Sequence, residues 1–157
     1  MAGRVGTRLV GAALVGVVAL GACGGGGSRL STRDYVKASS AVCVHANRDV
    51  ARIDVERLDR MGRADRAAVR ILAIHREAVD DLRALRPPKD YEATARLWIA
   101  LVDQALDELD SMRHALRTGA KAEATAYAAN AAALSERARR VAGRDGITAC
   151  AVPALTV

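Results

Sequence analysis

Apolar residues recur every three or four positions along most of this 157-residue chain, and this spacing limits the fold more than any other feature. The clearest run comprises Tyr91, Ala95, Trp98, Val102, Ala105, Leu109, Met112 and Leu116. Such spacing places the side chains on one face of a long helix. Between Thr32 and Val141 the chain contains only two prolines, which are adjacent. The pattern predicts an all-α fold.

Prolines and glycines divide this pattern into four helices. Pro87 has no amide proton and disfavours helical geometry at Arg86, so a helix should end there. Ser31 and Asp34 approximate a capping box at the first helix start. The glycines expected to end the other helices are Gly62, Gly119, Gly143 and Gly146. The expected helices span residues 33–61, 64–86, 90–118 and 120–142. Short connections make consecutive helices antiparallel, which predicts an up-down-up-down four-helix bundle domain over 32–157.

The N-terminal segment carries its only charges before a short uncharged run. Arg4 and Arg8 precede the run, which extends over residues 9–20. About a dozen residues are fewer than the ~20 that a membrane-spanning helix needs. This order of features is typical of a secretory signal.

The sequence Leu20-Gly21-Ala22-Cys23 directly after this run resembles the lipobox of bacterial lipoproteins. The resemblance implies that residues 1–22 are a cleaved signal peptide and that the Cys23 sulfur receives a diacylglyceryl group. Two acyl chains suffice for stable anchoring, here at the extracytoplasmic face of the cell membrane. Residues 23–31, which are rich in Gly and Ser, would form a flexible tether. An ordinary cleaved signal with a fortuitous cysteine is the alternative.

The remaining cysteines, Cys43 and Cys150, are expected to form a disulfide, since an oxidising compartment allows this one pairing. With four helices the chain end returns to the level where the first helix begins, within reach of Cys43. Three helices would leave the two sulfurs at opposite ends. A redox or metal role is the alternative, but the chain has no Cys-x-x-Cys motif.

Three histidines are the candidate ligand residues. His75 interrupts the apolar stripe expected in the second helix, where it is either a neutral core imidazole or a ligand. Two i,i+4 pairs place a histidine and an aspartate on one helix face: His45 with Asp49, and Asp110 with His114. This arrangement suits a metal site or a surface hydrogen bond. The Glu-x-x-His motifs of a di-iron bundle do not occur, and we expect no metal or other cofactor.

Charge and composition limit the classes of partner that the protein is expected to bind. Loss of Arg4 and Arg8 with the signal would leave 22 basic and 18 acidic residues, a balance of +4 instead of +6. Aromatic residues make up 3%, too few to stack single-stranded nucleic acid, so we expect no nucleic-acid partner. Arginines near the first and third connections could meet an anionic wall polymer or an acidic protein. Acidic residues interleaved with them favour an ion-paired surface instead.

The order of Cys43, Leu85-Arg86-Pro87-Pro88, Trp98, Gly119 and Cys150 is similar to that of small helical lipoproteins common in actinobacteria. This resemblance implies fold and compartment but no chemistry, and the chain has no phosphate-binding loop or nucleophile motif. We therefore expect a non-enzymatic, lipid-anchored module that interacts with an envelope component or membrane protein. The alternative is a small-ligand or metal carrier with a cavity between helices near His75.

Overall fold

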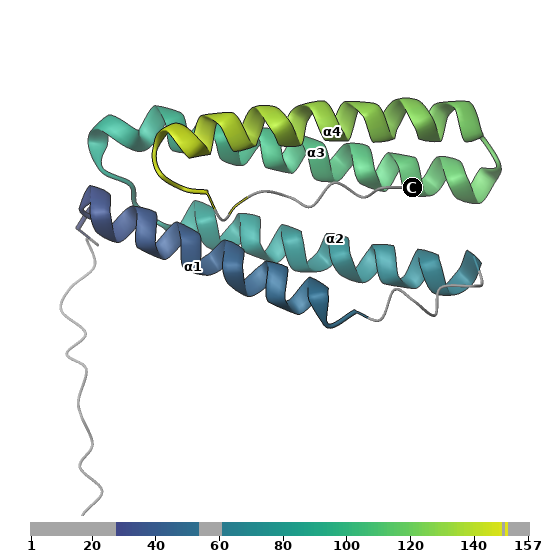
Figure 1. The fold of residues 1–157 in the computed structure, drawn as a ribbon, viewed down its shortest axis with the longest axis horizontal. Coiled ribbons are helices and arrows are strands. Elements are labelled where there is room, and N and C mark those ends of the chain that lie inside the picture. Colours follow the sequence, from purple (N-terminus) through teal and green to yellow (C-terminus); the bar gives the residue numbers. More distant parts are fainter. Residues whose placement is uncertain (1–27, 54–60, 149, 151–157) are drawn as a thin grey trace, which may run out of the picture.

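The computed structural model describes residues 28–53, 61–148 and 150, and within these ranges all regular structure is helical. The helices are α1 (Thr32–Ala51), α2 (Met61–Ala84), the short 3-10 helix η1 (Lys89–Tyr91), α3 (Glu92–Thr118) and α4 (Lys121–Arg144). Consecutive α-helices run antiparallel (Figure 1). The predicted all-α, up-down-up-down bundle is confirmed. The expected signal peptide and most of the expected tether lie outside the described residues.

The helices form two layers, with α1 and α2 in one and α3 and α4 in the other (Figure 1). Helix α3 is central because it packs against both α2 and α4, whereas α1 packs chiefly against α2. Its apolar face is buried along its length, with Trp98 and Leu106 each 1% exposed. After α4 the chain turns back and buries Ile147 and Cys150 in the core cluster. This returning segment therefore helps to fill the bundle.

Several helix ends follow local sequence signals. Ser31 caps α1, since its hydroxyl accepts a hydrogen bond from the Asp34 amide at 3.2 Å and donates to the Asp34 carboxylate at 2.6 Å. Helix α2 ends at Ala84, just before the two prolines. Helix α3 ends at Gly119, whose φ of 79° is a left-handed conformation that glycine adopts without strain.

Two predicted boundaries at the first connection are wrong. Helix α1 ends at Ala51 rather than at residue 61. Directly after Ala51, the Arg52 amide donates hydrogen bonds back to the carbonyl oxygens of Asp49 and Val50. Gly62 does not end a helix but lies in the first turn of α2. A helix tolerates an isolated glycine, and a Cβ atom added at Gly62 would meet only the end of the flexible Arg66 side chain. Residues 54–60 lie outside the described part of the chain.

Helix α4 also continues past its expected end. It includes Gly143 and stops at Arg144, and Gly146, with φ 79°, provides the left-handed turn that follows. Among the helices that the structure describes, none combines the length and apolar character needed to cross a membrane.

Candidate functional site

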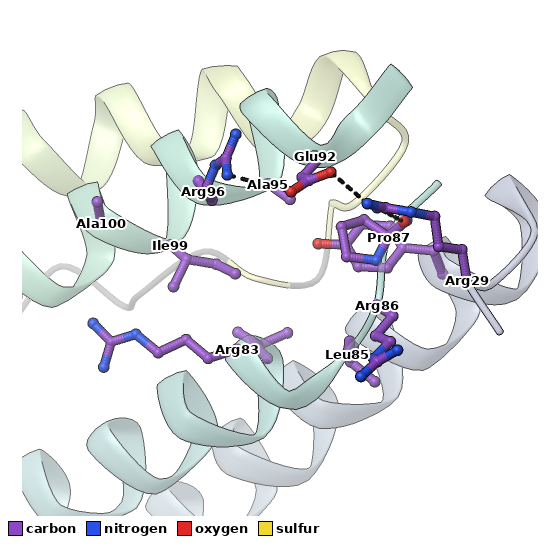
Figure 2. Close-up of a pocket in the computed structure, with 12 residues that line it drawn as sticks. Arg29, Arg83, Leu85, Arg86, Pro87, Glu92, Ala95, Arg96, Ile99 and Ala100 are labelled. Carbon is purple, nitrogen blue, oxygen red and sulfur yellow. Dashed lines mark hydrogen bonds and ion pairs between the residues drawn. The ribbon is translucent and has the colours of Figure 1, made fainter. Parts of the chain in front are cut away.

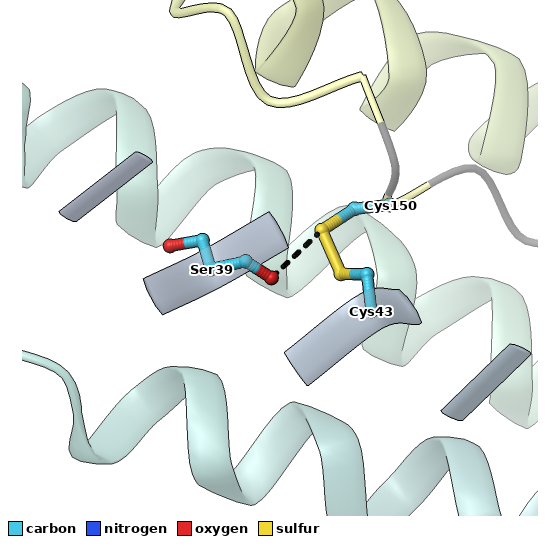
Figure 3. The surroundings of a disulfide bond; sticks show 3 residues. All are labelled: Ser39, Cys43 and Cys150. Atoms are coloured by element: carbon cyan, nitrogen blue, oxygen red, sulfur yellow. Dashed lines mark hydrogen bonds between the residues drawn. A yellow bond between two sulfur atoms is a disulfide. The ribbon is translucent and has the colours of Figure 1, made fainter. Parts of the chain in front are cut away.

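The two cysteines expected to pair form a disulfide between α1 and the segment after α4 (Figure 3). The Cα atoms of Cys43 and Cys150 lie 4.9 Å apart, within the usual range for a cystine. The Cys150 sulfur also lies 3.6 Å from the carbonyl oxygen of Ser39. A cystine sulfur carries no proton, so this is a packing contact. The disulfide predicted from the sequence is thus present, while Cys23 lies outside the described residues.

His75, on α2, is buried in the core of the bundle. Its side chain is 6% exposed, and Nδ1 lies 2.9 Å from the carbonyl oxygen of Ile71, to which it donates a proton. The Nε2 atom has no hydrogen-bond partner among the described residues. The cavity beside it, next to Trp98 and the disulfide, has a volume of about 30 Å³. That volume holds about two water molecules, not an organic ligand.

The two i,i+4 pairs differ in the structure. His45 Nε2 lies 3.2 Å from an oxygen of Asp49, on the exposed surface of α1. Asp110 instead binds Arg113 at 2.9 Å, on the same helix. His114 lies beside Asp110 in a broad polar groove, without a hydrogen bond to it that the structure shows. No group of three potential metal ligands comes together in the part of the chain that the structure describes.

A polar cluster missed by the sequence analysis lies in the core near the start of α1. The Tyr35 hydroxyl lies near Ser39 and Trp98. The side-chain polar atoms of these three residues are buried and make no hydrogen bond of regular geometry. Burial raises the pKa of Tyr35 and outweighs the nearby Ser39 and Trp98, which lower it, while the charge of Asp145 also raises it. Because the sequence places Tyr35 and Asp145 more than 100 residues apart, only the fold reveals this proximity.

The pocket that combines charged with apolar walls lies at the end of the bundle where residues 28–31 enter α1 (Figure 2). We call it the arginine pocket, and its volume is about 430 Å³. The residues lining it are Arg29, Tyr35, Leu82, Arg83, Leu85, Arg86, Pro87, Glu92, Ala95, Arg96, Ile99 and Ala100. The lining therefore includes four arginines and one glutamate beside an aliphatic wall.

The segment before α1 forms one rim of the arginine pocket. The Leu30 amide donates to the carbonyl oxygen of Arg86 at 2.9 Å. Arg29 donates to the carbonyl oxygen of Pro87 at 3.0 Å and forms an ion pair with Glu92 at 2.8 Å. These contacts bind the N-terminal segment to the connection between α2 and η1.

Glu92 forms ion pairs with two arginines at this rim. Arg96, one turn along α3, lies 3.3 Å from the other carboxylate oxygen (Figure 2). Arg83, on the far wall, has its own partners in Asp103 at 2.6 Å and Asp80 at 3.3 Å. The hydrogen bond from Arg83 to Asp103 raises the pKa of that guanidinium. The unbalanced positive charge therefore lies at the Arg29 rim.

This pocket was not predicted from the sequence, because Arg29 directly follows the Gly/Ser run of the expected tether. The available signal was compositional, since Arg29 and Leu30 depart from the Gly/Ser run before them. Comparisons with protein-family models, with curated proteins and with solved structures find no match to this chain. The site is therefore interpreted from its own geometry.

Proposed function

We propose that the protein is a non-enzymatic helical module held at the extracytoplasmic face of the cell membrane by a diacylglyceryl group on Cys23. It would act there by interaction with an envelope component or a membrane protein. The observation that carries this proposal is the lipobox-like sequence Leu20-Gly21-Ala22-Cys23, preceded by a charged and then an uncharged segment.

Two features of the folded domain support this location. Helix α1 begins at Thr32, nine residues after Cys23, so little chain separates an anchor from the bundle. The disulfide between Cys43 and Cys150 suits an oxidising compartment outside the cytoplasm. Both features fit a domain displayed close to the membrane surface.

The described side chains support a binding role over catalysis. Both described cysteines are joined in the disulfide, and so are not free nucleophiles. His75 donates Nδ1–H to a backbone carbonyl in the core, and His45 pairs with Asp49 at the surface. A carrier with its cavity at His75 has less support, because that cavity holds only water-sized molecules.

The anchor is tested by Cys23→Ala in the full chain expressed in a bacterium that processes lipoproteins. We expect the native protein to fractionate with membranes and to carry the added mass of a diacylglyceryl group. The variant should lack that mass and lose stable membrane attachment. Ala22→Gly keeps a small residue before the cysteine and serves as the matched control. Unchanged mass and unchanged fractionation of Cys23→Ala would contradict the proposal.

The interaction is tested by crosslinking in intact cells. Photoreactive residues at exposed positions such as Val44 and Leu97, on α1 and α3, sample different faces of the bundle. One reproducible envelope partner from one face is the expected result. Equal, non-specific crosslinking from both positions would count against a dedicated interaction surface.

A further inference from the structure

The arginine pocket combines three properties that are found together in sites for anionic amphiphiles. We propose that it binds the phosphate headgroup of an anionic phospholipid in the membrane to which the protein is anchored, with the first part of an acyl chain on its aliphatic wall. This inference rests on the proposed membrane attachment and adds a lipid ligand to it.

The first property is the excess of guanidinium over carboxylate at the rim. Arg29 and Arg96 both bind Glu92, so a single negative charge is shared between two positive ones. Guanidinium groups bind phosphate oxygens through two parallel N–H donors. Arg96 is 74% exposed in its side chain, so it can turn from Glu92 toward a phosphate without breaking core contacts.

The second property is the aliphatic wall behind this rim. Leu82, Leu85, Ala95 and Ile99 line the pocket between α2 and α3. Figure 2 shows Ile99 projecting into the space between the two helices, between Arg83 and Arg96. The volume of about 430 Å³ lies within the range of small-ligand sites. A bare anion would leave most of this wall in water, whereas a lipid covers it.

The third property is position relative to the anchor. Arg29 follows Cys23 by six residues, which can span at most about 21 Å when fully extended. The hydrogen bonds from Arg29 and Leu30 to the α2–η1 connection keep this exit point at the pocket rim. A lipidated Cys23 would thus hold the pocket within reach of lipid headgroups.

The same geometry favours a lipid over an extended wall polymer. A repeating polyanion needs a continuous basic stripe to gain affinity. The positive rim instead stops at Arg83, where Asp103 and Asp80 balance the arginine. One phosphate fits this arrangement better than a row of them.

Binding can be measured by native mass spectrometry on the full chain purified from membranes in a non-ionic detergent. The probes are dihexanoyl-phosphatidylglycerol, zwitterionic dihexanoyl-phosphatidylcholine and inorganic phosphate. We expect one phosphatidylglycerol per protein, bound about tenfold or more tightly than phosphatidylcholine, as for one added hydrogen bond to a charged group. Inorganic phosphate should compete weakly because it leaves the aliphatic wall bare.

Three variants identify the pocket as the binding site. The double variant Arg29→Gln/Arg96→Gln should bind the two lipids equally. Glu92→Gln removes the competing carboxylate and should tighten phosphatidylglycerol binding severalfold, a gain that unfolding cannot mimic. Arg117→Gln removes one exposed arginine from the opposite end of α3 and should change nothing.

Several results would overturn the proposal. Equal binding of the two lipids by the native protein would do so, as would competition by inorganic phosphate as strong as by the lipid. If Glu92→Gln did not tighten phosphatidylglycerol binding, the charge argument would also be rejected. The intact mass of the same preparation reports the Cys23 adduct separately. A missing adduct with selective lipid binding refutes the anchor alone, and an adduct without selective binding refutes the pocket alone.

Discussion

Two groups of ion pairs in the bundle contain the same kinds of charged residue in opposite proportions. At the distal end, where α2 begins and α3 ends, Arg113 lies 2.8 Å from Asp65 and 2.9 Å from Asp110. Asp110 also lies 3.4 Å from Arg76, which lies 3.4 Å from Asp107. In this network two arginines pair with three carboxylates. At one rim of the arginine pocket, Arg29 and Arg96 share only Glu92.

The difference shows that a count of arginines does not identify a binding surface. The distal network bridges α2 and α3 and satisfies its own charges, so it acts as a structural contact. The arginine pocket leaves positive charge for a ligand. Its ion pairs are also more exposed, and exposed pairs contribute only about 0–1 kcal/mol each. The predictions below test whether the ends differ in stability as well as in charge.

The largest expected effect comes from removing the disulfide. The double variant Cys43→Ala/Cys150→Ala opens a loop with a sequence separation of 107 residues. We expect a loss of about 2–4 kcal/mol in the free energy of unfolding, measured by urea denaturation. Hydrogen exchange should speed up most around Ile147 and Tyr35, which pack in the same core cluster. An equal increase at Arg113 and Asp65 would show that the two ends do not differ in this respect.

A smaller effect is expected at Gly119, which connects α3 to α4 at the distal end. A Cβ atom there would meet nothing within 4 Å, so Gly119→Ala tests backbone conformation alone. The left-handed φ of 79° should cost an alanine about 1–2 kcal/mol in stability. Gly143→Ala, inside α4 with equal open space, is the control and should stabilise by about 0.5–1 kcal/mol. Similar thermal melting of both variants would contradict this account.

The distal network itself is tested by Arg113→Ala. This change leaves Asp65 and Asp110 without their shortest partner, and the Arg113 side chain is only 20% exposed. We expect a loss of about 1 kcal/mol in unfolding free energy, reduced by high salt. Arg117→Ala, one turn later and exposed, should change stability by less than about 0.5 kcal/mol. Equal losses in the two variants would show that the network adds no stability.

Much of the fold could be predicted because its signals are local. The prolines at 87 and 88 and the glycine at 119 end helices by backbone chemistry, and the predicted disulfide followed from pairing two remaining cysteines. Gly62 misled the prediction because a helix can include one glycine when its neighbours pack well. The early end of α1 was not predicted, because the apolar residues in this segment are irregularly spaced and interrupted by polar ones. No residue there clearly marks the end of a helix.

The candidate site was harder to predict because it combines distant segments. Arg29, Arg83 and Arg96 come from the N-terminal segment, α2 and α3, and only the packing brings them to one pocket. Asp110, a candidate partner of His114 by its i,i+4 spacing, pairs in the structure with Arg113 at i+3. Spacing within one helix therefore identifies candidate contacts but does not choose between them.

The last and smallest prediction concerns acid titration, where the two ends should respond with opposite sign. At Asp110, partial burial raises the pKa, but the hydrogen bonds and charges of Arg113 and Arg76 outweigh it and lower the pKa below its ordinary value of 3.8. An acid whose folded-state pKa is depressed stabilises the fold above its unfolded pKa, and this contribution is lost as pH falls through the folded-state value.

Asp145, beyond the end of α4, shows the reverse shift. Burial raises its pKa above 3.8, and one of its carboxylate oxygens is buried without a hydrogen bond. The folded state then holds this proton more tightly than the unfolded state, so stability declines as pH rises from 3.8 through the folded-state pKa. At pH 7 we expect Asp145→Asn to stabilise the protein and Asp110→Asn to destabilise it, each by less than about 1 kcal/mol. As the pH falls, the two differences should shrink as each carboxyl group becomes protonated, first at Asp145 and later at Asp110. Urea denaturation at pH 3 and pH 7 measures this, and shifts of the same sign at pH 7 would show that burial at Asp145 does not oppose its ionisation.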